Sequence, residues 1–142
     1  MKLPDANLLL YALDDLSPHH GPARAWLDGI LSGVEPVGFS WVVILAFIRV
    51  STRVRLSSRP LSVAEALDIV DGWLAQPCAQ VVEPSDRHVQ VLRGLLEPLG
   101  TAGDLSSDAH LAALAIEYGG EVCSADNDFA RFPGVRWVNP LV

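Results

Sequence analysis

Four aspartates stand where an α/β protein could bring them together. Asp5 follows the short apolar segment 2–4, and Asp126 and Asp128 follow the apolar segment 121–124. In open parallel sheets, ligand sites lie beyond the carboxyl ends of the strands, so acids placed there are candidates for chemistry. Asp108 opens a predicted helix, where the partial positive charge of the helix N-terminus favours a carboxylate.

Carboxylates gathered at one sheet edge repel one another unless a cation lies among them. Hard oxygen ligands suit Mg²⁺ or Mn²⁺, so convergence of these acids predicts a divalent metal site. Each acid also has a purely structural interpretation. Asp5 could cap a helix, Asp108 could be an ordinary helix-start acid, and Asp126 and Asp128 could belong to a turn.

His110 lies two residues beyond Asp108 on the same predicted helix. Successive residues of a helix point about 100° apart, so a metal shared by the two side chains is not implied. We expect a supporting or structural role for His110.

Short apolar segments alternate with helical patterns along the chain. The predicted strands are 2–4, 37–40, 79–82, 121–124 and 135–138. Parallel strands need crossover connections, which helices supply, so the alternation predicts a three-layer α/β fold. We expect a central parallel sheet of four to five strands with helices on both faces.

Local signals predict where the helices begin and end. Ser17-Pro18 offers one start, and Ser62 with Glu65 forms a capping box for another. A helix over 41–54 carries arginines near its end. Further expected boundaries are a cap at Ser85 or Asp86, a cap at Ser106 or Ser107 before a helix over 108–118, and a stop at Gly119-Gly120.

The composition suits one compact domain spanning residues 1–142. The chain has 142 residues and is 50% hydrophobic, with no run near the roughly 18 apolar residues of a membrane span. Cys78 and Cys123 lie in apolar stretches, which fits reduced buried thiols. We therefore expect a soluble cytoplasmic protein without a membrane segment.

The net charge of −7 argues against a broadly basic surface for nucleic acid. The segment 36–64 is an exception, because it has no acidic residue and carries the four arginines Arg49, Arg53, Arg55 and Arg59. These arginines could form a cationic strip on an acidic body, or they could be solvated individually. On a helix over 41–54, Arg49 and Arg53 would share one face with Ala46 and flank the acidic cluster.

Three segments resemble the acidic motifs of VapC-type PIN domains. They are Leu3-Pro4-Asp5-Ala6-Asn7-Leu8, Ser107-Asp108-Ala109-His110-Leu111, and Ser124-Ala125-Asp126-Asn127-Asp128-Phe129. The resemblance covers nearly the whole chain, with the motifs in family order. Each motif alone is ordinary, whereas the three together, with matching length and α/β alternation, are specific.

The resemblance implies a Mg²⁺- or Mn²⁺-dependent endoribonuclease that acts as the toxin of a toxin–antitoxin pair. Asp5, Asp108 and Asp126 would bind the metal, with Asp128 as an accessory acid. Asn7 and Ser124 would be polar supporting groups, and Arg49 and Arg53 would contact the RNA substrate. The implied partners are a VapB-like antitoxin and a second copy of the chain.

The second family motif departs from the pattern. The family commonly has a glutamate at the position that Ala46 occupies in Leu45-Ala46-Phe47-Ile48-Arg49. Either Asp128 or Asp104 substitutes for the missing acid, or water fills its place, or the enzyme is weak. We expect Asp128 to compensate, because it lies two residues beyond Asp126 in the same turn.

Two other function classes deserve comparison. A catalytically weak or inactive PIN-fold module that binds RNA or a partner is compatible with Ala46 and with the acidic charge. Phosphoryl-transfer proteins such as response-regulator receivers or haloacid-dehalogenase-like phosphatases use a late lysine. This chain has no lysine after Lys2, and Asp5-Ala6-Asn7 lacks the second aspartate of the phosphatase motif.

Overall fold

The computed structural model describes residues 1–54 and 59–142. Arg55 and most of the loop expected over 56–60 therefore lie outside the described residues. In the described part of the chain, no helix is long and apolar enough to span a membrane. Cys78 and Cys123 are free thiols; Cys123 is buried as expected, whereas Cys78 is only half-buried.

Five parallel strands form one sheet in the order β3-β2-β1-β4-β5. The strands are β1 (Lys2–Pro4), β2 (Val37–Ser40), β3 (Ala79–Val82), β4 (Glu121–Cys123) and β5 (Trp137–Val138). Strands β2 and β3 follow one another on one side of β1. The chain then crosses to the other side of β1, where it forms β4 and β5. The strand order thus reverses between β1 and β4, which is where open α/β sheets bind ligands.

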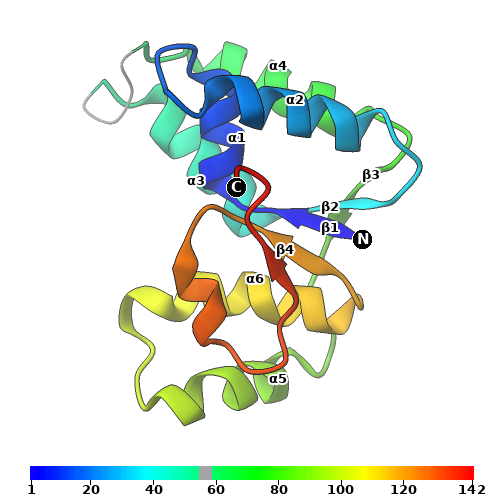
Figure 1. The fold of residues 1–142 in the computed structure, drawn as a ribbon, viewed down its shortest axis with the longest axis vertical. Helices are drawn as coiled ribbons and strands as arrows, with labels where there is room; N and C mark the ends of the chain where they lie inside the picture. The colour runs from blue at the N-terminus through cyan, green and yellow to red at the C-terminus, as the bar shows by residue number, and fades with distance from the viewer. Residues whose placement is uncertain (55–58) are drawn as a thin grey trace.

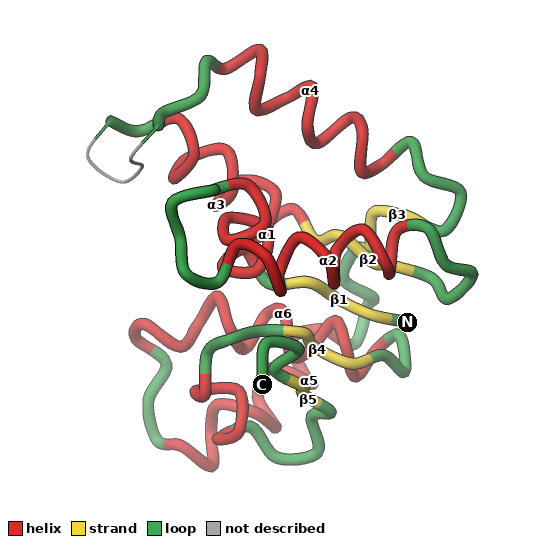
Figure 2. Tube along the Cα trace, turned by 45° about the horizontal axis from the view of Figure 1, so that its top comes forward, coloured by secondary structure: helices red, strands yellow, loops and turns green. Residues whose placement is uncertain are grey.

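Helices cover both faces of this sheet, which confirms the predicted three-layer α/β fold. One layer holds α1 (Ala6–Leu13), α2 (His20–Leu31), α3 (Trp41–Thr52) and α4 (Val63–Leu74), and the other holds α5 (His88–Leu96) and α6 (Ser106–Glu117) (Figure 1). Figure 2 shows the short strands enclosed between these helical layers. The described residues also form three 3-10 turns: η1 (Glu97–Leu99), η2 (Gly103–Leu105) and η3 (Asn127–Arg131).

The core joins the sheet to both layers. Leu3, Phe39 and Val122 on the strands and Phe47 on α3 are all fully buried. Helix α6 is buried on nearly every side over residues 111–115. A helix that is apolar all round belongs in an interior, so the position of α6 follows from its composition.

Some helix boundaries follow the predicted signals. Ser62 and Glu65 form the expected capping box of α4. Helix α6 ends before Gly119, whose φ of +63° is accessible to glycine without strain. At Gly120, a Cβ would come within 2.6 Å of a Leu3 methyl group and 3.0 Å of the Met1 carbonyl oxygen, so this position needs glycine for a close approach.

Three other boundaries differ from the predictions, and at two of them a serine serves a turn instead of a cap. The Ser17 hydroxyl accepts from the His19 N–H, and α2 begins only at His20. The Ser85 hydroxyl accepts from the Arg87 N–H, and α5 begins at His88. Helix α6 begins at Ser106 itself, directly after η2, without a side-chain cap.

Candidate active site

Asp5 connects the end of β1 to the start of α1. It is the N-cap of α1, and its Oδ1 accepts the Ala6 N–H at 2.7 Å. Its Oδ2 accepts the Ser124 hydroxyl at 2.7 Å and the Asn7 side-chain amide at 3.3 Å. Both carboxylate oxygens of Asp5 are therefore held in fixed orientation by neighbouring donors.

Ser124, directly after β4, ties the two central strand ends together. Its side chain is fully buried. The hydroxyl donates to Asp5 and accepts both the Asn7 amide and the Asp126 N–H, each at 3.0 Å. Asn7 in turn accepts the Ala125 N–H at 3.3 Å. These bonds position the turns that follow β1 and β4, and they place Asn7 and Ser124 against the acidic residues.

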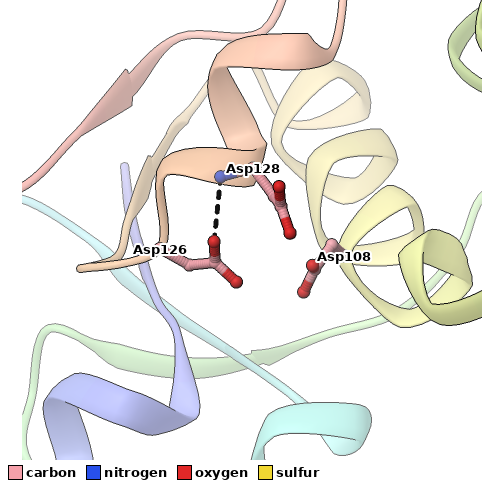
Figure 3. Close-up of side chains that lie close together, drawn as sticks. All are labelled: Asp108, Asp126 and Asp128. Atoms are coloured by element: carbon pink, nitrogen blue, oxygen red, sulfur yellow. Dashed lines mark hydrogen bonds between the residues drawn. The ribbon is translucent and has the colours of Figure 1, made fainter.

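Asp126 and Asp128 lie in the turn that opens η3. The Asp126 side chain caps this turn by accepting the Asp128 N–H at 2.8 Å. Asp108 approaches from the first turn of α6. Asp108, Asp126 and Asp128 each offer a carboxylate oxygen within 4.8 Å of the others, and the three side chains point into one shared space (Figure 3).

Burial and neighbouring charges disfavour the ionised forms of Asp5 and Asp108. Burial raises the pKa of Asp5, and the charge of Asp126 adds to the effect, although hydrogen bonds from Ser124 and Ala6 oppose it. Partial burial raises the pKa of Asp108 to about 6, with further contributions from Asp5, Asp126 and Asp128. A bound cation would remove this repulsion.

The donor chemistry of the three-carboxylate group fits a hard divalent cation. Oxygen ligands of Mg²⁺ lie at about 2.1 Å, so opposite ligands are about 4.2 Å apart. The group of Asp108, Asp126 and Asp128 is close to that span. Cys123 is unsuited to metal binding here, because burial raises the pKa of its thiol to about 12 and keeps it protonated.

A small pocket of about 180 Å³ adjoins Asp108 on the side of α3. Asp5 and Asp108 supply its acidic wall, and Ala46 and Arg49 face it from α3. Ser107, which the sequence analysis named as a possible helix cap and not as a site residue, also lines this pocket. Its place beside Asp108 at the start of α6 is the signal that could have indicated it.

Two predicted site residues lie apart from this arrangement. Helix α3 ends at Thr52, earlier than expected, and Arg53 follows it with extended backbone angles. Helical periodicity therefore stops before Arg53, which is exposed and does not line the pocket with Arg49. Asp104 is exposed in η2 and is not a member of the three-carboxylate group.

A second polar cluster joins α5 to α6 and was not predicted. Glu117 accepts hydrogen bonds from the Ser85 hydroxyl and from the Ser85 N–H, and it pairs with the His88 ring. The other ring nitrogen of His88 lies 2.8 Å from His110 Nδ1. The members are distant in sequence and follow no motif, so the pattern of residues alone offers no signal for the cluster.

A cavity of about 390 Å³, more than twice the volume of the pocket beside Asp108, lies elsewhere, between α1, α2 and α4. Its lining is mainly apolar and includes none of the four aspartates. Volume alone therefore does not locate the chemistry of this protein, whereas the convergence of carboxylates does.

The sequence matches a known family over nearly its whole length. The model of the PIN domain family matches residues 2–135, which run from β1 to the residues just before β5. The chain belongs to the PIN-domain family. This PIN domain is also similar to Ribonuclease VapC37 of Mycobacterium tuberculosis, with 51% identity over 140 residues that cover 99% of this chain and 97% of the relative.

A second relative and a solved structure agree with this assignment. Ribonuclease VapC33 of Mycobacterium tuberculosis is 40% identical over 141 residues, which cover 99% of both chains. The crystal structure of VapBC2 from Rickettsia felis, bound to a DNA fragment from its promoter, shares the fold with a TM-score of 0.70. That comparison covers 97% of each chain at 17% sequence identity, so it bears on the fold alone.

Proposed function

We propose that this PIN domain is a metal-dependent endoribonuclease and the toxin of a toxin–antitoxin pair. The observation that carries the proposal is the meeting of Asp5, Asp108, Asp126 and Asp128 where the strand order reverses. The names of the relatives, which describe ribonucleases, support the choice of RNA as substrate. The reaction adds water across a phosphodiester bond and releases one phosphate end and one hydroxyl end.

The sequence predicted Asp5, Asp108 and Asp126 as the metal ligands, with Asp128 as an accessory acid. The carboxylates that lie within 4.8 Å of one another are those of Asp108, Asp126 and Asp128, and these three would hold a Mg²⁺ or Mn²⁺ ion between them. When bound, the ion activates water and neutralises charge that develops on the phosphate. Asp5 contributes a fourth negative charge beside this group, and its hydrogen bonds with Ser124 and Asn7 hold it in place. Asn7 and Ser124 are therefore positioning residues, because they act through Asp5 and Asp126.

Arg49 and Arg53 would contact the RNA backbone. Both arginines belong to the segment 36–64, which lacks acidic residues. Arg49 lines the pocket beside Asp5 and Asp108, whereas Arg53 is exposed outside that pocket. On a chain with a net charge of −7, a local cationic contact offsets part of the repulsion between protein and RNA.

The proposed partners are a VapB-like antitoxin and a second copy of this chain. Structural neighbours include the VapBC2 complex of Rickettsia felis, which supports an antitoxin partner for this chain. Residues 1–142 would act as a single nuclease domain, in the cytoplasm where cellular RNA is found.

The proposal is tested by incubating the purified protein with total cellular RNA in Mg²⁺, in Mn²⁺ and in EDTA. We expect cleavage with either metal and none with EDTA. Asp126→Asn, which keeps the side-chain shape but removes a charge, should lose cleavage by at least about 100-fold. The matched control is Asp104→Asn, because Asp104 is exposed and lies outside the carboxylate group.

Absence of cleavage by the folded parent protein under all metal conditions would favour the inactive binding module instead. Equal activity of the Asp126→Asn and parent proteins would remove the assigned site. If the parent protein cleaves RNA, sequencing the 5′ ends of the products would identify the target and the cleavage position.

A further inference from the structure

Trp137 forms a hydrogen bond from its side chain to the backbone of the neighbouring strand. Its indole Nε1–H donates to the carbonyl oxygen of Ser124 at 3.0 Å. Trp137 is partly buried and belongs to β5, a strand of only two residues at the edge of the sheet. The acceptor lies directly after β4, so this bond is made where the chain leaves β4 for the acidic turn.

The register between β4 and β5 explains why a side chain is needed as the donor. The Ser124 N–H donates to the Val138 carbonyl oxygen at 3.0 Å. In a parallel ladder, the N–H and the C=O of one residue bond to residues two apart on the neighbouring strand. The Ser124 carbonyl would therefore accept from residue 140, but Pro140 has no N–H. The Trp137 indole supplies the donor that the backbone lacks at this point.

The peptide between Ser124 and Ala125 is thereby held from two sides. Its carbonyl oxygen accepts from Trp137, and its N–H donates to the side-chain oxygen of Asn7 at 3.3 Å. A peptide unit is planar and rigid, so these two bonds together fix its orientation. Asp126 follows this peptide directly, and the orientation of the peptide therefore sets where the Asp126 carboxylate lies.

The same bond also anchors the side chain of Ser124. This side chain is fully buried, and its hydroxyl donates to Asp5 at 2.7 Å and accepts the Asp126 N–H at 3.0 Å. Hydrogen bonds weaken steeply when their distance and angle depart from these values. A shift of the Ser124 backbone would therefore disturb the acids that follow both central strands, Asp5 and Asp126.

We propose that Trp137 is a positioning residue of the carboxylate group, and that its indole N–H acts through the carbonyl of Ser124. The N–H performs this role, and the packing of the aromatic ring does not. This inference rests on the proposed function, because it assumes that Asp108, Asp126 and Asp128 bind a divalent cation.

The first test measures the dissociation constant of Mn²⁺ by electron paramagnetic resonance at pH 7.5. Trp137→Phe keeps an aromatic ring but removes the donor, and it should weaken Mn²⁺ binding by about tenfold, the lower end for residues that orient metal ligands. Circular dichroism would establish that the variant is folded. Trp26→Phe is the matched control, because Trp26 is also partly buried but lies on α2, and it should stay within twofold of the parent.

An unchanged dissociation constant in folded Trp137→Phe would overturn the inference and leave the proposed function standing. Absence of Mn²⁺ binding by the parent protein would overturn both. An equal loss of affinity in Trp137→Phe and Trp26→Phe would also overturn the inference, because the effect would then not be specific to the indole that bonds Ser124.

The second test asks whether Trp137 acts through the peptide that it shares with Asn7. Asn7→Ala removes the other bond to this peptide. Independent changes multiply their effects on the dissociation constant, whereas changes to one shared group do not. We expect Trp137→Phe to weaken Mn²⁺ binding by less than twofold in the Asn7→Ala background. A full tenfold loss there would overturn the proposed route through the Ser124 carbonyl.

The third test uses the parent protein, so it does not depend on the folding of a variant. Two-dimensional ¹⁵N–¹H NMR detects the indole N–H groups of the four tryptophans separately. Addition of Mg²⁺ should shift the Trp137 indole resonance clearly more than that of Trp26, because the Trp137 N–H bonds the backbone two residues before Asp126. An unmoved Trp137 resonance at saturating Mg²⁺ would show that the indole is not coupled to the carboxylate group, and would overturn the inference.

Discussion

At the scale of single residues, Asp108 couples the charge of the site to the stability of the protein. Its carboxyl group is partly buried and faces Asp5, Asp126 and Asp128, which together raise its pKa to about 6. A carboxyl whose pKa is raised on folding destabilises the folded state once it is ionised. The effect is absent below the unfolded pKa of about 3.9, grows between the two values, and is complete above the folded pKa.

Asp108→Asn should therefore stabilise the metal-free protein at neutral pH and not in acid. We expect a gain of about 1 kcal/mol at pH 7.5, after allowance for solvent screening of a half-exposed group, and no gain at pH 4. Urea unfolding in EDTA at the two pH values measures this difference. An equal gain at both would show that charge is not the cause, and exposed Asp104→Asn serves as the control.

Asp128 is the acid that we expect to compensate for Ala46. One of its carboxylate oxygens belongs to the group formed with Asp108 and Asp126. Its Oδ1 also lies 3.8 Å from Nη1 of Arg131. Asp128→Asn should raise the Mn²⁺ concentration for half-maximal binding by about tenfold, since one of few protein ligands is lost. Asp104→Asn should leave it unchanged, and the reverse result would transfer the role to Asp104.

At the scale of elements, α5 and α6 are held together by the cluster of Ser85, His88, His110 and Glu117. The Glu117 side chain is only 4% exposed. Burial alone would raise the pKa of Glu117, but hydrogen bonds from Ser85 and His88 outweigh it and hold the pKa below the ordinary value. Because α6 also carries Asp108, this cluster anchors a helix on which the site depends.

His88→Ala should destabilise the protein by about 2 kcal/mol at pH 7, because it leaves a buried carboxylate short of a partner. The lowered pKa of Glu117 means that its stabilisation is present above the unfolded pKa of about 4.5 and is lost as pH falls through the folded value. In Glu117→Gln, this loss of stability in acid should be smaller. Urea unfolding between pH 3 and pH 7 tests both variants, and an identical acid dependence in Glu117→Gln and the parent would contradict the assignment.

At the scale of the whole molecule, the site depends on the order of strands. The turns after β1 and β4 meet because these strands are neighbours, with three residue pairs in register from Lys2 and Glu121 to Pro4 and Cys123. Helix α6, which covers the face of the sheet opposite to α1, places Asp108 beside Asp126 and Asp128 (Figure 1). A ligand that bridges Asp108 and Asp126 therefore links separate parts of the fold.

Mn²⁺ should accordingly stabilise the folded protein as a whole. At a free concentration 100 times the dissociation constant, the expected gain is about 2.7 kcal/mol. Thermal unfolding with Mn²⁺ and with EDTA measures this gain, which should largely vanish in a variant carrying Asp108→Asn and Asp126→Asn. Persistence of the full gain in that double variant would place the ion elsewhere.

Local patterns in the sequence were sufficient to predict the layers of this fold. Strand-length apolar segments and helix caps depend on residues that are close in the sequence. The alternation of strands and helices, the capping box at Ser62 and the glycine stop at Gly119 could therefore be predicted without a structure. The acids that directly follow strands could also be recognised as site candidates, because the carboxyl ends of parallel strands lie at one edge of their sheet.

Only the tertiary structure decided which side chains meet. The reversal of strand order between β1 and β4 joins Asp5 to Ser124, although 119 residues separate them. The end of α3 at Thr52 removes Arg53 from the face of Arg49, and the packing of α5 on α6 brings His88 to Glu117. Such contacts depend on how whole elements pack, and the periodicity of a single segment carries no information about its distant neighbours.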